Sequence, residues 1–162
     1  MRVALAVVLL LGASLPAARA TADAHDDALV ARLSHRSVQP RRAELEAAIP
    51  DVRARLLRLA VDRGTSPFAR RRGLIVLAEW TGDDEVAQLY ERLLRDEDTA
   101  GGLRFRLLRL LALVHPGRSV RTIGWAACQD DAVLKSGARR ALTFLEGAAR
   151  RRAEEAVARC PR

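Results

Sequence analysis

Apolar residues recur along the chain at the spacing of one helix face. In the clearest segment, Leu134 is followed by apolar residues at the fourth, seventh, eighth and eleventh positions after it, ending at Leu145. Segments that begin at Ala69 and Leu103 repeat this stripe, with Gly73 as the small exception. Such spacing predicts amphipathic α-helices that each bury one face.

A basic residue follows the first apolar position of each segment, at Arg70, Arg104 and Lys135, so the spacings are 34 and 31 residues. A near-constant period of this length is typical of helical repeat proteins. Between the marked helices we predict second helices at 83–95, 120–128 and 148–160, separated by turns at 80–82, 96–102 and 129–131. The chain is therefore predicted to be all-α, with about three helix pairs in one stack.

Three further helices are predicted upstream. One runs from 51 to 63, with Pro50 at its first position, where proline is tolerated. Shorter helices at 26–33 and 42–49 would cover the N-terminal end of the stack, which a repeat array has to protect. We therefore assign 21–49 to a partly mobile helical cap and 50–162 to the repeat domain.

The first twenty residues have the pattern of an export signal. Arg2 precedes an apolar run, Val3–Leu11, and Ala18-Arg19-Ala20 supplies a cleavage pattern of small residues. The run is shorter than the about 20 apolar residues of a membrane-spanning helix. An uncleaved anchor and a buried helix of the fold are the alternatives. We predict a cleavable signal peptide at 1–20 and a periplasmic or extracellular location.

Composition agrees with a helical domain. Hydrophobic residues make up 49% of the chain and aromatic residues only 4%, so the core has to come from Leu, Ala and Val, which suits closely packed helices. Without Arg2 and Arg19, 26 of the 28 basic residues remain against 20 acidic ones, which leaves a net charge of about +6. Ordinary soluble domains carry charges of this size, so the charge alone does not indicate a polyanionic partner.

Cys128 and Cys160 are the only cysteines, and they are 32 residues apart, about one repeat period. They are therefore expected at equivalent places in neighbouring second helices, where an oxidising compartment would allow a disulfide. Two separate thiols are the alternative, because adjacent helix axes lie about 8–10 Å apart and both side chains would have to point inward.

The third segment, Asp130 to Leu145, resembles a HEAT repeat of the short bacterial kind described as PBS-lyase-like. It has an acidic pair followed by apolar–basic–x–x–Ala–x–x–Ala–Leu–x–x–Leu. The second copy keeps Asp96 and Asp98 but adds Gly101-Gly102, and the first copy lacks the acidic pair. The resemblance covers roughly residues 50–160. It implies a short right-handed α-α superhelix of about three HEAT-like helix pairs that binds proteins, usually along the concave surface of the second helices.

In this family the acidic and basic positions commonly join one repeat to the next. The resemblance therefore implies that a set of charged residues acts first as struts between repeats and only second as ligand contacts. This set consists of Arg70, Arg104, Lys135, Asp98 and Asp131.

Two aromatic residues are candidates for contact with a partner. Tyr90 and Trp125 are 35 residues apart on successive second helices, so a solenoid would place both near one surface. Exposed aromatic residues are typical anchors of protein interfaces. Trp80 instead occupies the last apolar position of the first marked helix and is expected in the core.

No group of residues indicates catalysis, and we predict no enzyme activity, no cofactor and no metal site. His25, His35 and His115 are scattered, and no Ser-His-Asp or Cys-His arrangement has a supporting context. Gly101-Gly102 lacks the Lys-Ser/Thr that a phosphate-binding loop requires. The sequence gives no reason to expect a small-molecule ligand.

The leading interpretation is an exported protein-interaction module or scaffold that binds a partner protein. The alternative is an Arg-mediated binder of anionic polymers or lipid surfaces, which the triplets at 70–72 and 150–152 suggest. An Arg-rich solvated surface balanced by the acidic residues would show the same triplets. Export, and the scarcity of aromatic residues for base stacking, argue against nucleic acid.

Overall fold

Nine α-helices form the regular structure of residues 15–160, the part of the chain that the computed structural model describes, and no strand occurs there. Side chains are described from residue 24 onward. The helices are α1 (Leu15–Ser34), α2 (Arg42–Ala48), α3 (Val52–Val61), α4 (Pro67–Leu77), α5 (Asp84–Arg95), α6 (Gly101–Val114), α7 (Pro116–Cys128), α8 (Ala132–Leu142) and α9 (Gly147–Ala158). The prediction of an all-α fold is confirmed.

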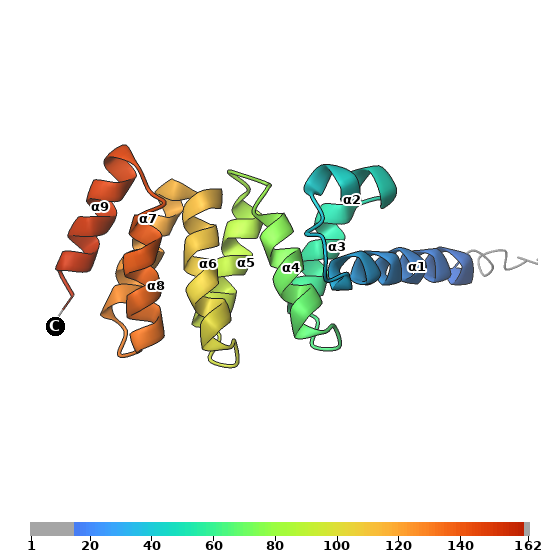
Figure 1. The fold of residues 1–162 in the computed structure, drawn as a ribbon, viewed down its shortest axis with the longest axis horizontal. Helices are drawn as coiled ribbons and strands as arrows, with labels where there is room; N and C mark the ends of the chain where they lie inside the picture. Colours follow the sequence, from blue (N-terminus) through green and yellow to red (C-terminus); the bar gives the residue numbers. More distant parts are fainter. Residues whose placement is uncertain (1–14, 161–162) are drawn as a thin grey trace, which may run out of the picture.

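The helices from α3 onward follow one another along a row (Figure 1). Each of α3–α4, α5–α6 and α7–α8 is an antiparallel hairpin whose two helices contact each other. Helix α6 also packs beside α8, and α7 beside α9, so the second half of the row has two layers. At the other end, α1 runs roughly perpendicular to the helices of the row, extends beyond it and packs against α4.

The N-terminal helices belong to the same core as the hairpins. Leu29, Leu33 and Leu45 are completely buried. The buried guanidinium of Arg72 donates hydrogen bonds to the backbone carbonyls of two residues in the 35–41 connection, His35 and Val38. The region predicted as a helical cap is therefore packed onto the first hairpin from residue 24 onward.

Two predictions concern residues at the limits of the described chain. The apolar run Val3–Leu11 lies outside the described residues, and the expected cleavage point at 18–20 falls within α1. None of the helices in residues 15–160 is long and apolar enough to cross a membrane.

Polar caps set where several helices begin. The carboxylate of Asp83 accepts hydrogen bonds from the first-turn amides of α5, and Asp131 does the same for α8. Ser66 caps α4, which continues with Pro67 at its first position. No side chain caps α6, which begins after Ala100.

The hairpin turns repeat one motif. Asp62 accepts hydrogen bonds from the Gly64 amide and the Thr65 hydroxyl, and Asp96 accepts the equivalent bonds from Asp98 and Thr99. These turns are 34 residues apart and connect α3 to α4 and α5 to α6. Both hairpins therefore place equivalent turns on the same side of the row (Figure 1).

Small residues let the helices approach closely. A Cβ atom added at Gly137 in α8 would lie 2.8 Å from the Cδ1 atom of Leu108 and 3.3 Å from the Cα atom of Phe105, both in α6. A larger residue at this position would require the Leu108 side chain to move and the two helices to shift slightly. The core between the helices is built mainly of Leu, Ala and Val, and Trp80 is buried in it, as predicted.

Candidate binding cleft

A cleft of about 1050 Å³ opens between the hairpin α3–α4 and the hairpin α5–α6. One wall consists of the end of α3, the Asp62 turn and the start of α4, and the other of the end of α5, the Asp96 turn and the start of α6. Five arginines line it: Arg63, Arg70, Arg71, Arg92 and Arg106. We call this hollow the basic cleft.

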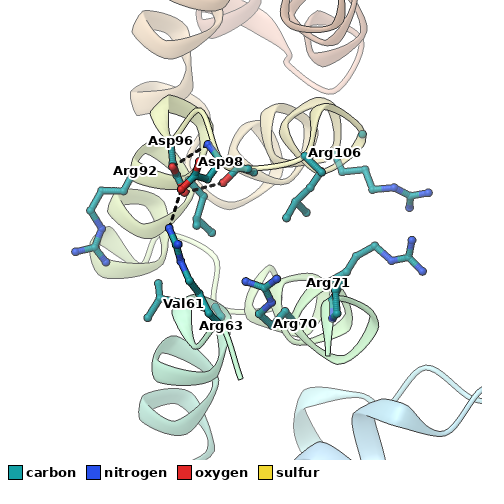
Figure 2. Close-up of a pocket in the computed structure, with 15 residues that line it drawn as sticks. Val61, Arg63, Arg70, Arg71, Arg92, Asp96, Asp98 and Arg106 are labelled. Atoms are coloured by element: carbon teal, nitrogen blue, oxygen red, sulfur yellow. Dashed lines mark hydrogen bonds and ion pairs between the residues drawn. The ribbon is translucent and has the colours of Figure 1, made fainter. Parts of the chain in front are cut away.

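The arginines come from both walls of the basic cleft (Figure 2). Arg70 extends from α4 into the space between the hairpins, while Arg71 and Arg106 extend in the same direction from opposite walls. Arg92 projects from α5 on the other side. The positive charges thus surround the opening instead of forming one row.

The two acidic residues of the basic cleft already have partners. The carboxylate of Asp98 lies 2.8 Å from the Arg63 guanidinium, and Asp96 accepts the hydrogen bonds of its own turn. Within the described chain, the other four arginines of the cleft form no ion pair. Positive potential in a concave site attracts anionic groups, so the cleft is suited to bind carboxylates or phosphates.

Apolar side chains contribute to both walls of the basic cleft. Val61 at the end of α3 is 52% exposed, and Pro67, Leu93 and Leu103 also line the cleft. A site of this composition offers contacts to apolar atoms between the charged groups. Both walls therefore combine charged and apolar groups.

A second, more open hollow of about 510 Å³ lies beside the basic cleft, between the N-terminal halves of α6 and α8. It is lined mainly by apolar atoms, and Phe105 and Val133 form its sides. Gly102 and Arg106 line both hollows. We call the second hollow the apolar hollow.

Three of the five predicted struts form ion pairs between neighbouring hairpins. Arg104 of α6 lies 3.2 Å from Asp131, which caps α8, and Asp98 pairs with Arg63 of the preceding hairpin. Within the described chain, the other two form no ion pair between hairpins. Arg70 forms no ion pair with a described residue and lines the basic cleft instead, and Lys135 lies 3.8 Å from Asp130, in the turn before its own helix.

Other ion pairs join the hairpins at places away from the Asp62 and Asp96 turns. The Arg53 guanidinium donates to Asp83 at 2.6 and 2.8 Å, and Arg118 donates to Glu91 at 2.9 Å. The hydrogen bond from Arg53 lowers the pKa of Asp83 to about 2. Burial opposes the ionisation of Glu91, but hydrogen bonds from Arg118 and Thr122 outweigh it and lower the pKa of Glu91.

We expect the free energy of unfolding to fall as the pH drops from about 5 towards 2. Both carboxylates have lower pKa values in the folded chain than in the unfolded chain, so their contribution is complete above the unfolded pKa of about 4. It is lost as the pH falls through the folded pKa. Asp83→Asn should flatten this part of the pH profile in urea unfolding, because asparagine can still cap α5 but does not ionise.

Asp98→Asn is the matched control for this pH profile. Asp98 and its partner Arg63 have side chains that are 73% and 80% exposed, and exposed pairs contribute little to stability. The control profile should stay close to that of the parent chain. If Asp83→Asn and Asp98→Asn gave the same profile as the parent, the assigned role of Asp83 would be wrong.

The prediction that Tyr90 is exposed for a partner is wrong. Its side chain is completely buried, and its hydroxyl donates a 2.6 Å hydrogen bond to the carbonyl oxygen of Leu74 in α4. Burial also raises the pKa of the Tyr90 hydroxyl, which keeps it protonated as a donor. Trp125 is half-buried, with the Arg95 guanidinium 5.4 Å from the ring centroid. A partner contact at Trp125 remains a prediction.

Cys128 and Cys160 form a disulfide in the structure, with their Cα atoms 5.0 Å apart. The first lies at the end of α7 and the second just after α9. The alternative of two separate thiols is excluded for this structure.

The described residues contain no group of three or more His, Cys, Asp or Glu side chains that could hold a metal ion. His115 contacts the Asp84 carboxylate at 3.2 Å, and His35 hydrogen-bonds to Ser37. The His35 contact is local to the connection after α1. The His115 contact joins the starts of α7 and α5.

Sequence reasoning missed the basic cleft, because it placed binding on the second helices. A usable signal was present in the Asp-x-x-Thr motif at 62–65 and 96–99, whose 34-residue spacing puts the two turns and the arginines around them side by side. None of the family models, curated proteins or solved structures compared with the chain matches it.

Proposed function

We propose that this chain is an exported, non-catalytic binding module that holds an acidic segment of a partner protein in the basic cleft. The observation that carries the proposal is the set of four arginines without ion pairs, Arg70, Arg71, Arg92 and Arg106, around one concave opening. A short right-handed superhelix of HEAT-like pairs is the architecture that we propose for the whole, and the antiparallel hairpins and the 34-residue repeat of turns support it.

An acidic protein segment fits the basic cleft better than a lipid surface does. The opening is concave and has apolar residues in both walls, whereas a flat membrane contacts residues that protrude. Val61 and Leu93 offer contacts to the aliphatic parts of a peptide. Binding of anionic polymers or lipids is the alternative that the experiment has to exclude.

Export is part of the same proposal. The disulfide between Cys128 and Cys160 fits an oxidising compartment, as does the signal-like pattern at residues 1–20. An extracytoplasmic location would bring the cleft into contact with segments of envelope or secreted proteins.

Charge reversal in the basic cleft tests the binding proposal. We expect the full chain to bind a fluorescein-labelled, glutamate-rich peptide in an anisotropy titration at low salt. Arg106→Glu should weaken this binding by about tenfold or more, because it replaces an attraction with a repulsion close to the ligand. Arg106 is exposed and forms no ion pair with a described residue, so the variant should fold normally.

Arg121→Glu makes the same charge change in α7, outside the cleft, at another exposed arginine without an ion pair to a described residue. It should change the peptide affinity by less than about threefold, through long-range charge alone. Equal losses in both variants would show diffuse attraction and contradict the cleft. Binding to phosphatidylglycerol vesicles without binding to the peptide would support the lipid alternative instead.

A further inference from the structure

The basic cleft and the apolar hollow share part of their lining. Both are lined by Gly102 and Arg106, at the start of α6 and one turn further along it. A Cβ atom added at Gly102 would meet no atom within 4 Å, so the surface between the two hollows is open. One ligand can therefore occupy both hollows by crossing α6 at its first turn.

The two hollows differ in the chemistry that they offer. Arginines surround the first, whereas Phe105 and Val133 dominate the second, and Val133 is 39% exposed although it is a large apolar residue. An exposed apolar side chain beside a positively charged opening would gain from contact with another apolar group. A purely acidic ligand would leave this hollow unused.

The dimensions set the spacing of the ligand groups. The apolar hollow lies one helix further along the row than the basic cleft, and neighbouring helix axes are about 8–10 Å apart. An extended chain advances about 3.3 Å per residue. The two hollows are therefore about three residues apart along an extended peptide.

We propose that the ligand is an extended protein segment in which an apolar residue follows or precedes an acidic residue by about three positions. The acidic side chain lies in the basic cleft near Arg106, and the apolar side chain lies between Phe105 and Val133. This inference rests on the proposed function, because it specifies which acidic segments the module selects.

Two peptides of equal length and charge test the selectivity. Both are glutamate-rich, and one carries a leucine three positions from its acidic run where the other carries a serine. The leucine peptide should bind the full chain about tenfold more tightly in anisotropy titrations, because its side chain is partly buried. Arg106→Glu should weaken the binding of both peptides.

Val133→Ser supplies the matched variant. Val133 lines the apolar hollow but not the basic cleft, and it is 39% exposed, so serine should leave the fold intact while it removes the apolar contact. The leucine peptide should lose its tenfold advantage, while the serine peptide should bind as before. Leu113→Ser is the control, because Leu113 is also an exposed apolar residue, at 42%, and lines neither hollow.

The outcomes separate this inference from the proposed function. If both peptides bind equally and depend on Arg106, but Val133→Ser has no effect, the acidic site stands and the apolar contact is wrong. If neither peptide binds the parent chain, both the inference and the proposed function are overturned. A leucine advantage that disappears in Val133→Ser and persists in Leu113→Ser supports both.

Discussion

Tyr90→Ala should lower the free energy of unfolding by about 3–5 kcal/mol, the range seen when a large buried aromatic side chain is removed from a core. Tyr90 is completely buried in α5, and its hydroxyl reaches the Leu74 carbonyl in α4. The substitution would leave a cavity between two consecutive helices and remove a direct link between them.

The hydrogen bond of Tyr90 has a specific reason. At its C-terminal end α4 tightens, and the amide of Ala78 donates to Ile75 instead of to Leu74. Carbonyl groups in the last turn of a helix need other partners, and the Tyr90 hydroxyl is a partner of the Leu74 carbonyl. Tyr90→Phe keeps the ring but removes this donor, so it should cost about 1–3 kcal/mol.

Urea unfolding followed by circular dichroism measures both changes. Leu113→Ala is the control, because Leu113 is also apolar but 42% exposed, and it should cost much less than Tyr90→Ala. A Tyr90→Ala variant as stable as the control would mean that Tyr90 is not a core residue. In that case its role as a partner-binding residue would have to be considered again.

Most of the helical pattern could be predicted because it follows from local chemistry. The apolar stripes and the caps Asp83 and Asp131 place α5 and α8 within a residue or two of their predicted starts. Two connections were predicted wrongly. Helix α7 begins at Pro116, separated from α6 by His115 alone, because proline fits the first position of a helix. Helix α6 begins at Gly101, within the predicted turn.

The candidate site could not be predicted, because it depends on how the helices pack against one another, which the sequence does not show. The triplet Arg70-Arg71-Arg72 appeared as one cluster, yet its members have different roles. Arg70 and Arg71 line the basic cleft, whereas Arg72 is buried and holds the connection after α1. Consecutive helical residues point about 100° apart, so only the packing of α4 decides which of them is exposed. Tyr90 was misassigned for the same reason.

Removing the disulfide should destabilise the C-terminal end of the row most. In α9, Ala153 is the one completely buried residue among its described side chains, so the helix has little apolar area with which to pack. The Cys128–Cys160 disulfide joins its end to α7 across a separation of 32 residues. In the chain-entropy description, a cross-link that closes a loop of this length stabilises the folded state by about 3–4 kcal/mol.

The double variant Cys128→Ser/Cys160→Ser should therefore lose about 3–4 kcal/mol in urea unfolding, and the parent chain should lose a similar amount when a reductant is added. Amide hydrogen exchange should become faster in α9 before it changes in α5. Binding of an acidic peptide to the basic cleft should persist under conditions where the variant is folded, because α9 lies outside the cleft.

In protein isolated from its host, both cysteines should react with a thiol reagent only after reduction. Free thiols there, with no effect of reductant on stability, would contradict both the structural role of the disulfide and the proposal of export.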